Sequence, residues 1–212
     1  MTHIDYTLYL VTDRSVMSAK SLEQAVEQAI QGGCTVVQLR EKYASSREFF
    51  ETAQRVKQIK DSYHIPLIIN DRTDICLAVN AAGIHIGQQD LPAKIVRSMV
   101  GPDKIIGVSA ATLSEAIQAE QDGADYLGVG AMFATSTKTN TRPVTIERLT
   151  QIKQAVQIPV VAIGGIQSSN VTTLTDTGID GIAVVSAILA QENITHAAEQ
   201  LKACFTGAGH EV

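Results

Sequence analysis

The chain has 212 residues, with 17 Lys and Arg against 22 Asp and Glu, which gives a formal net charge of −5. A hydrophobic fraction of 45% and a charged fraction of 18% exclude the disordered and fibrous classes. The chain has no basic block suited to a nucleic acid or a membrane surface, and no apolar run reaches the roughly 20 residues that span a bilayer. We therefore expect neither a nucleic-acid nor a membrane partner.

The cysteines and the first residues bear on the cellular compartment. Cys34, Cys76 and Cys204 are scattered and form neither a disulfide framework nor a CxxC pair. Residues 1–14 lack the basic-then-apolar order of a signal peptide. We expect a cytoplasmic protein in a reducing environment.

Short apolar runs rich in β-branched residues recur along the chain, and most are apolar nearly throughout. That pattern is typical of parallel strands covered by helices on their outer face. The predicted strands are 8–11, 35–39, 67–69, 84–86, 105–108, 126–129, 160–163 and 181–185.

Amphipathic segments separate these runs, and the clearest predicted helices are 22–31, 47–60, 113–121 and 146–155. Ser21 with Gln24, and Thr112 with Glu115, have the spacing of a capping box at helix starts. A weak repeat places glycine-containing segments before every second strand, at 32–35, 82–85, 123–126 and 178–181. The alternation predicts a single-domain (β/α)₈ TIM barrel over residues 1–212. A doubly wound open sheet remains the alternative, although the first turn, 12–15, has no GxGxxG.

In such a barrel the site lies where the strands end. After the second predicted strand, alternation puts Gln38, Arg40 and Lys42 on one side, and three such donors fit a phosphate or a diphosphate. Asp71 and Asp90 follow neighbouring strands, and two carboxylates with phosphate oxygens are a usual way of holding Mg²⁺. The alternatives are a solvated strand end for the basic residues, and turn or N-cap roles for the carboxylates.

Three later segments complete the predicted mouth of the barrel. Ser109 is a lone hydroxyl without an evident activating histidine, so we expect it to bind rather than to attack. Residues 131–143 form the longest helix-free loop and suggest an anion clamp, the alternative being a plain polar loop. Gly164-Gly165 and 185–187 end the last two strands, where barrels often bind a phosphate monoester. His85 is expected to be a satisfied barrel or interface histidine, not a catalyst.

Eight motifs in order along the chain resemble the thiamine-phosphate synthase (thiamine-phosphate pyrophosphorylase) family. They are QLREK at 38–42, ND at 70–71, GIHIGQ at 83–88 with Asp90, GVS at 107–109, GADY at 123–126, TSTK at 135–138, IGGI at 163–166 and VSAI at 185–188. The resemblance implies a Mg²⁺-dependent transferase of thiamine biosynthesis. It would join hydroxymethylpyrimidine diphosphate to thiazole ethyl phosphate, giving thiamine phosphate and diphosphate.

The resemblance also implies a role for individual residues. Asp71 and Asp90 would hold Mg²⁺, and catalysis would rest on Arg40, Lys42, Ser109 and Lys138. The pyrimidine diphosphate would be bound by Gln38, Arg40, Lys42, Asn70, Ser109 and Lys138. The thiazole phosphate would be bound by Thr135, Thr137, Gly165, Val185 and Ser186. Arg72 departs from the family pattern, because many relatives carry a second aspartate there.

Two rival functions are weighed against this one. A thiazole tautomerase of the same superfamily relies on a histidine after the fifth strand, where this chain has Ala110 and Ala111. A non-catalytic sensor of a phosphate ligand has no need of both a carboxylate pair and a diphosphate clamp. The expected partners are small phosphorylated substrates and, as an open option, further copies of the chain.

Overall fold

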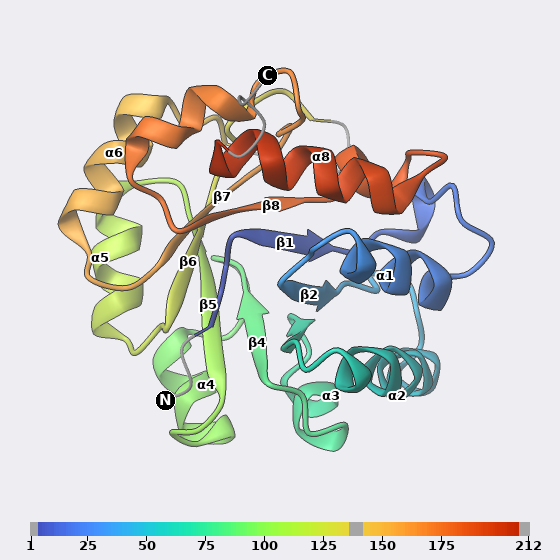
Figure 1. Ribbon diagram of the computed structural model, residues 1–212. Coiled ribbons are helices and arrows are strands. Elements are labelled where there is room, and N and C mark those ends of the chain that lie inside the picture. Colours follow the sequence, from blue (N-terminus) through green and yellow to red (C-terminus); the bar gives the residue numbers. More distant parts are fainter. Residues whose placement is uncertain (1–3, 136–141, 208–212) are drawn as a thin grey trace.

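The computed structural model describes residues 4–135 and 142–207. Within them, parallel strands pair in chain order and β8 closes onto β1, forming a barrel of eight strands (Figure 1). The strands are β1 (Leu8–Val11), β2 (Val36–Leu39), β3 (Leu67–Asn70), β4 (Gly83–Ile86), β5 (Ile105–Ala110), β6 (Tyr126–Val129), β7 (Val160–Ile163) and β8 (Gly181–Val184). The predicted TIM barrel is confirmed, and the alternative of an open sheet is wrong because the pairing of β1 with β8 leaves no edge.

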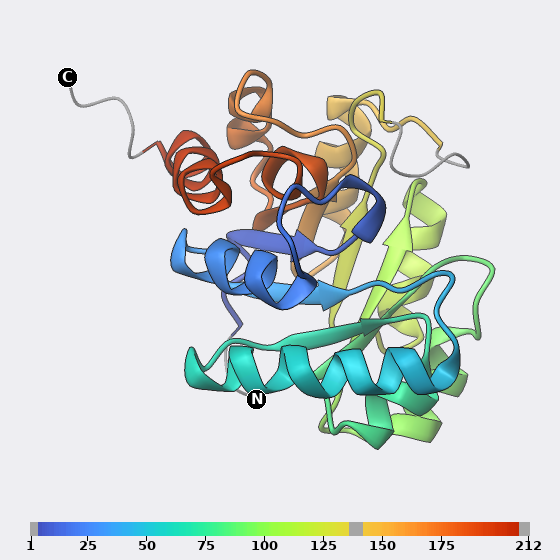
Figure 2. The same ribbon diagram turned by 90° about the vertical axis from the view of Figure 1, so that its right-hand side faces the viewer.

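Helices surround this barrel, and Figure 2 shows them from a second direction. They are α1 (Leu22–Gln31), α2 (Ser46–Ser62), α3 (Thr73–Ala78), α4 (Ala93–Val100), α5 (Leu113–Gln121), α6 (Ile146–Ala155), α7 (Ser186–Leu189) and α8 (Ile194–Thr206). The bounds predicted for α1, α5 and α6 are confirmed. Ser21 and Thr112 are the N-caps of α1 and α5, each accepting a backbone N–H three residues on.

Two connections differ from a plain αβ repeat. A short 3₁₀ helix, η1 (Arg14–Val16), precedes α1, and η2 (Val171–Thr177) replaces an α-helix between β7 and β8. Four of the seven residues of η2 are threonine, in the sequence VTTLTDT. Threonine is β-branched and its hydroxyl competes for nearby carbonyls, so this sequence favours the α-helix poorly.

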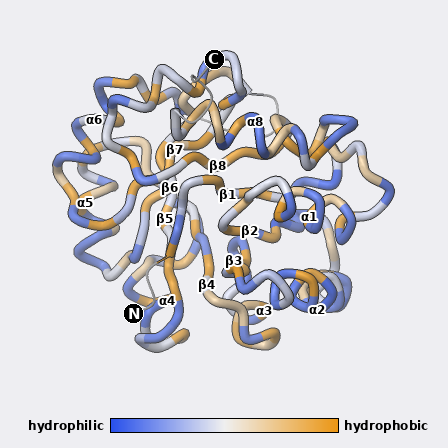
Figure 3. The backbone as a smooth tube through the Cα atoms, in the orientation of Figure 1, coloured by the Kyte–Doolittle hydropathy of each residue, from blue (hydrophilic) through white to orange (hydrophobic). Residues whose placement is uncertain are grey.

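The barrel wall separates two cores. The larger core lies between the strands and the helices and includes Leu10, Ile69 and Ile182. The smaller core fills the barrel itself, and its large members are Tyr6, Tyr9 and Tyr126. Figure 3 shows hydrophobic colour along the strands and hydrophilic colour on much of the surrounding helices. The interior is thus packed with side chains below the mouth, as expected for a barrel of this type. No helix of the described residues is long and apolar enough to cross a membrane.

Candidate active site

A cavity of about 1130 Å³ lies at the ends of the strands, and the residues that follow β2 to β8 line it. It is lined by every predicted site residue that the structure describes: Gln38, Arg40, Lys42, Asn70, Asp71, Asp90, Ser109, Thr135, Gly165, Val185 and Ser186. Thr137 and Lys138 lie outside the described residues. Ligand pockets usually measure about 300–1,000 Å³, so this cavity is large enough for more than one small substrate.

Charged side chains gather where β2, β3 and β4 end. We call Arg40, Lys42, Asn70, Asp71 and Asp90 the charged rim. The Arg40 guanidinium donates to the Asp13 carboxylate over 2.7 Å, and the Lys42 ammonium is paired with Asp71. Each cation of the rim therefore already has a carboxylate partner.

The two carboxylates of the rim are held by backbone geometry. Asp71 follows β3 with a φ of +61°, in the left-handed region, where Asp is more often found than most side chains. Asp90 accepts the backbone N–H of Gly87 over 2.7 Å, which ties it to the end of β4. Asp90 does not cap α4, whose N-cap is Pro92 with no side-chain hydrogen bond, so that alternative is wrong.

The carboxylates of Asp71 and Asp90 also interact electrostatically. Partial burial and the nearby Asp71 raise the pKa of Asp90, while the Gly87 N–H and Lys42 act in the opposite direction. Two close carboxylates repel unless a cation lies between or beside them. The pairing of Lys42 with Asp71 places one cation there already.

This donor set suits Mg²⁺, which is usually bound through one or two carboxylates while waters and substrate phosphates supply its remaining ligands. The described residues contain no group of three or more His, Cys, Asp or Glu side chains able to enclose a metal ion. Two carboxylates supply only part of the octahedral shell of Mg²⁺, so a metal held by Asp71 and Asp90 would keep positions open for substrate oxygens. The residues present fit a Mg²⁺ ion shared with a phosphorylated substrate.

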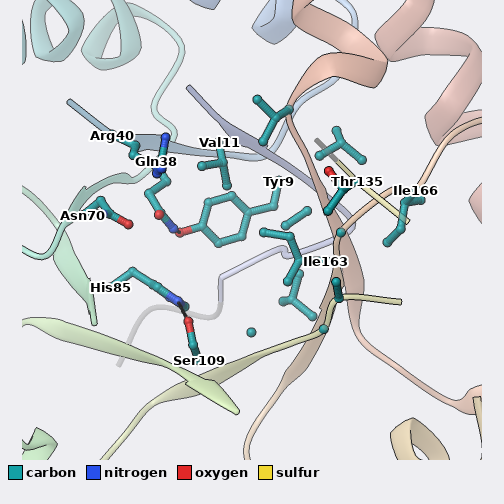
Figure 4. Close-up of a pocket in the computed structure, with 18 of the residues that line it drawn as sticks. Tyr9, Val11, Gln38, Arg40, Asn70, His85, Ser109, Thr135, Ile163 and Ile166 are labelled. Atoms are coloured by element: carbon teal, nitrogen blue, oxygen red, sulfur yellow. Dashed lines mark hydrogen bonds between the residues drawn. The ribbon is translucent and has the colours of Figure 1, made fainter. Parts of the chain in front are cut away.

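The floor of the cavity is polar and, within the described residues, contains no Asp, Glu, Lys or Arg. Gln38 donates from Nε2 to the Tyr9 hydroxyl over 2.9 Å, and the Tyr9 and Tyr126 hydroxyls lie 2.7 Å apart. His85 joins Tyr126 to Ser109. Its Nδ1 lies 2.9 Å from the Tyr126 hydroxyl. Its Nε2 lies 2.9 Å from Ser109 Oγ, a contact drawn in Figure 4.

The contact between His85 and Ser109 corrects one expectation. The sequence showed no histidine partner for Ser109, because the two residues are on different strands, but β4 and β5 are neighbours and bring them together. In a nucleophilic triad the second histidine nitrogen meets a carboxylate, whereas here it meets the phenol of Tyr126. Burial and the neighbouring Tyr9 raise the pKa of Tyr126, so it offers no negative charge to an imidazolium. This geometry therefore lacks the carboxylate of a nucleophilic triad, and binding stays the predicted role of Ser109.

The opposite side of the mouth is built from backbone. We call Thr135, Gly164, Gly165, Val185 and Ser186 the glycine side. Gly165 has a φ of +66°, and a Cβ there would lie 2.5 Å from the carbonyl oxygen of Ala134. The glycines thus allow the end of β7 to pack closely on the segment that follows β6, a requirement that does not depend on any ligand.

That segment is fixed at both described ends. Met132 and Phe133 donate backbone N–H groups to Ile163 and Gly164, and Ala131 donates to the carbonyl of Arg142 over 3.0 Å. The Arg142 guanidinium forms two hydrogen bonds, of 2.7 and 2.9 Å, with the carboxylate of Glu115 on α5. Thr135 is thereby held at the cavity, across from the charged rim in Figure 4.

Sequence reasoning missed Tyr9, Tyr126 and His85 as cavity residues. The sequence signal for them was a tyrosine within each of two otherwise apolar strands and a histidine within a third.

Arg72 does not line the cavity: its guanidinium contacts Asp74 and donates to Ser46 over 2.9 Å. Its positive charge is therefore directed away from the charged rim.

A closed (β/α)₈ barrel with a cavity at its mouth, lined by carboxylates and cations, has the layout of a TIM-barrel enzyme. The model of one family, described as thiamine monophosphate synthase, matches residues 8–188. A thiamine-phosphate synthase of Ruminiclostridium cellulolyticum is 61% identical over 202 residues, which cover 95% of this chain and 96% of that protein. One of Clostridium tetani is 58% identical, with coverage of 96% and 97%.

A solved structure agrees with these relatives. Thiamine phosphate pyrophosphorylase from Pyrococcus furiosus superposes with a TM-score of 0.89 at 38% identity, covering 97% of this chain and 98% of its own. The chain belongs to the thiamine monophosphate synthase family.

Proposed function

We propose that this chain joins hydroxymethylpyrimidine diphosphate to thiazole ethyl phosphate, giving thiamine phosphate and diphosphate. The observation that carries the proposal is the layout of one cavity in a chain of this family. A charged rim, a polar floor and a glycine side lie around the same space. These three parts match a diphosphate, a heterocycle and a phosphate monoester.

The charged rim is assigned to the diphosphate. Arg40 and Lys42, with Asn70, would bind its oxygens, and Lys138 would join them from the loop. Asp71 and Asp90 would hold Mg²⁺, which when bound offsets negative charge on the departing diphosphate. Fixed cations at the leaving group act where charge develops, which is the effect that most lowers such a barrier.

The floor is assigned to the pyrimidine. Gln38 and Ser109 would orient the ring so that its methylene carbon faces the thiazole nitrogen. The bond from that carbon to the diphosphate oxygen breaks, and the nitrogen lone pair forms the new carbon–nitrogen bond. The chain supplies no nucleophile in this scheme; its contribution is to position two anions and to stabilise the leaving group.

The glycine side is assigned to the thiazole phosphate. Thr135, Thr137 and Ser186 offer hydroxyls, while Gly165 and Val185 offer backbone. The first N–H groups of α7 have no partner within their own helix, which is the usual situation at a helix start. Ser186 and Ala187, the first two residues of α7, line the cavity, so their N–H groups are proposed to bind the phosphate.

The finer properties of the protein are also proposals. A cytoplasmic location agrees with its free thiols, Cys34, Cys76 and Cys204. We propose one domain over residues 1–212 and the possibility of a homo-oligomer, which sedimentation measurements would test directly.

The function is tested by measuring diphosphate release with both substrates and Mg²⁺. The expected result is stoichiometric release that requires the thiazole phosphate and stops when a chelator removes the metal. Binding of both phosphorylated ligands without any turnover would overturn the proposal and favour a sensor. Conversion of a thiazole isomer without diphosphate release would favour the tautomerase.

A further inference from the structure

A continuous chain of hydrogen bonds crosses the barrel interior beneath the cavity. It runs from Gln38 on β2 to Tyr9 on β1, Tyr126 on β6, His85 on β4 and Ser109 on β5. Its links measure 2.9, 2.7, 2.9 and 2.9 Å in that order. Gln38 and Ser109, the two ends, are the residues assigned to the pyrimidine. We call these five residues the interior chain.

The interior chain is built into the core and is not an incidental surface network. Tyr9 and Tyr126 are each 1% exposed and Gln38 is 4% exposed. Glycines make the space for its rings: a Cβ at Gly107 would lie 2.1 Å from the Tyr126 ring, and one at Gly128 would lie 3.0 Å from His85. The interior chain therefore depends on one glycine in β5 and one in β6, the strands that carry Ser109 and Tyr126.

Each hydroxyl in the interior chain has one proton, so the hydrogen bonds of the interior chain all run in one donor-to-acceptor direction. Gln38 donates to Tyr9, and the buried Tyr9 proton then finds its acceptor in the oxygen of Tyr126. The Tyr126 proton then goes to His85 Nδ1, and the Nε2 proton of that imidazole goes to Ser109. The Ser109 proton is left for a ligand. At the other end, the Gln38 carbonyl oxygen is left as an acceptor.

A phenol proton this deeply buried needs an acceptor, and with both phenol protons paired only one other arrangement satisfies every link while His85 is neutral. If Gln38 rotates its amide by half a turn, all the protons reverse, so Gln38 presents a donor and Ser109 presents an acceptor. The two ends cannot change independently, because each buried phenol in between donates only once and its proton must meet an acceptor. Burial raises the pKa of Tyr9 and of Tyr126, so both phenols keep their protons.

We propose that Tyr9, Tyr126 and His85 are positioning residues that couple the two ends of the interior chain, so that the pocket accepts a heterocycle with a donor facing Gln38 and an acceptor facing Ser109. An aminopyrimidine has this pattern: its amino N–H donates to Gln38 and an acceptor atom of the same substrate receives the Ser109 proton. A ring with an oxo group in place of the amino group has the wrong polarity at Gln38. The identity of the heterocycle rests on the proposed function, whereas the coupling rests on the hydrogen bonds alone.

The central test is Tyr126→Phe, which keeps the ring and removes the hydroxyl that joins both halves of the chain. Tyr9 then loses its acceptor and donates to the Gln38 carbonyl, so the amide turns and presents N–H to the ligand. Dissociation constants are measured for the aminopyrimidine diphosphate and its oxo analogue without the thiazole substrate. Binding is the better readout because the amino group also assists bond breaking.

Wild-type protein is expected to prefer the amino compound by about a hundredfold, since a buried donor or acceptor left without its partner is costly. Tyr126→Phe should reduce that preference about tenfold or more and should leave the affinity for thiazole phosphate unchanged. The matched control is Tyr6→Phe. The Tyr6 ring packs 4.9 Å from that of Tyr126, but within the described residues its hydroxyl makes no hydrogen bond to the interior chain.

If folded Tyr126→Phe kept the wild-type preference for the amino compound over the oxo compound, the coupling would be overturned. An equal loss of that preference in Tyr6→Phe would also overturn it. If Tyr126→Phe does not fold, Tyr9→Phe removes the hydroxyl that fixes Gln38 and is expected to lower the preference in the same way. Wild-type protein that binds with the expected preference but releases no diphosphate would overturn the proposed function and leave the coupling standing. Failure of each proposal is thus seen in a different measurement.

Discussion

The two sides of the cavity mouth bind by different means. The charged rim has two cations, Arg40 and Lys42, and two carboxylates, Asp71 and Asp90, all acting through side chains. The glycine side has no charged member and offers backbone and hydroxyl groups at the ends of β7 and β8. Figure 4 shows Tyr9 between labelled residues of the two sides, with Arg40 and Asn70 on one side and Thr135 on the other.

This difference agrees with what each side is proposed to hold. A diphosphate that leaves gains charge during the reaction, so fixed cations and a metal are useful there. A phosphate that only anchors its substrate keeps the same charge throughout, and N–H groups are sufficient for it. We therefore expect side-chain changes to matter most at the charged rim and backbone changes to matter most at the glycine side.

The largest effect is expected for Asp71→Asn, which keeps the size of the side chain and removes one negative charge from the proposed metal site. Turnover is expected to fall about 100-fold, the scale of losing one electrostatic contact to a developing charge. The Mg²⁺ concentration for half-maximal rate should rise, while thiazole phosphate binding stays the same. Steady-state kinetics over a Mg²⁺ series and a direct binding titration measure the two effects.

Asp176→Asn is the matched control for this charge removal. Asp176 lies in η2, is exposed and does not line the cavity, so its variant should match the wild-type protein in both measurements. Unchanged turnover in Asp71→Asn would contradict the metal assignment. A large loss of thiazole phosphate binding would contradict the division of the mouth into two sides.

The complementary change on the other side is Gly165→Ala. A left-handed φ costs a non-glycine residue roughly 1–2 kcal/mol, and the new Cβ would meet the Ala134 carbonyl at 2.5 Å. The KM for thiazole phosphate should rise about tenfold, as expected from an energy of this size, because Thr135 moves with that backbone. The KM for the pyrimidine diphosphate should change little.

Gly178→Ala separates backbone strain from the effect on the site. Gly178 also has a positive φ, +74°, but a Cβ there meets nothing within 4 Å and the residue does not line the cavity. This variant should lose stability in urea unfolding and keep both KM values. If Gly165→Ala resembled Gly178→Ala in its kinetics, the glycine side would have no part in substrate binding.

The fold was predictable because its signals are local. Strands such as 160–163 are apolar throughout and helices such as 113–121 begin at a capping threonine, so alternation and caps fix most bounds. The exception is η2, whose threonine-rich sequence has no strong preference. Closure of the barrel was the remaining step, and it followed from counting repeats.

The site was predictable only in part, for a physical reason. Residues placed after a strand could be assigned to the mouth, and those within the described chain line the cavity. The interior chain could not be seen, because Tyr9 and Tyr126 are 117 residues apart in sequence and meet only when β1 and β6 face each other across the barrel. The contact of His85 with Ser109 depends in the same way on the register of β4 and β5.

The smallest expected effect concerns the one cation near the glycine side that the structure describes in detail, Arg142. Its guanidinium is paired with Glu115, so we expect it to anchor the loop and not the substrate. Arg142→Gln should lower the free energy of unfolding by less than about 1 kcal/mol, because the arginine side chain is 56% exposed and surface pairs contribute little. Both KM values should stay within twofold of the wild-type values, on the scale of a contact worth a few tenths of a kcal/mol.

The pH dependence of this stability difference has a definite sign. Burial alone raises the pKa of Glu115, but Arg142 and the backbone N–H of Ala111 outweigh it and the net pKa is lowered. A carboxylate with a lowered pKa contributes stability above its unfolded pKa of about 4.3 and loses it as pH falls through the folded value. The gap between wild type and Arg142→Gln should therefore be present at neutral pH and shrink in acid. Urea unfolding at both pH values, with Arg55→Gln as a control that breaks the 2.6 Å pair with Glu23 far from the mouth, measures it. A gap that grew in acid would contradict a stabilising pair between Arg142 and Glu115. A loss of thiazole phosphate binding found in Arg142→Gln alone would make Arg142 a phosphate ligand and give the glycine side a charge of its own.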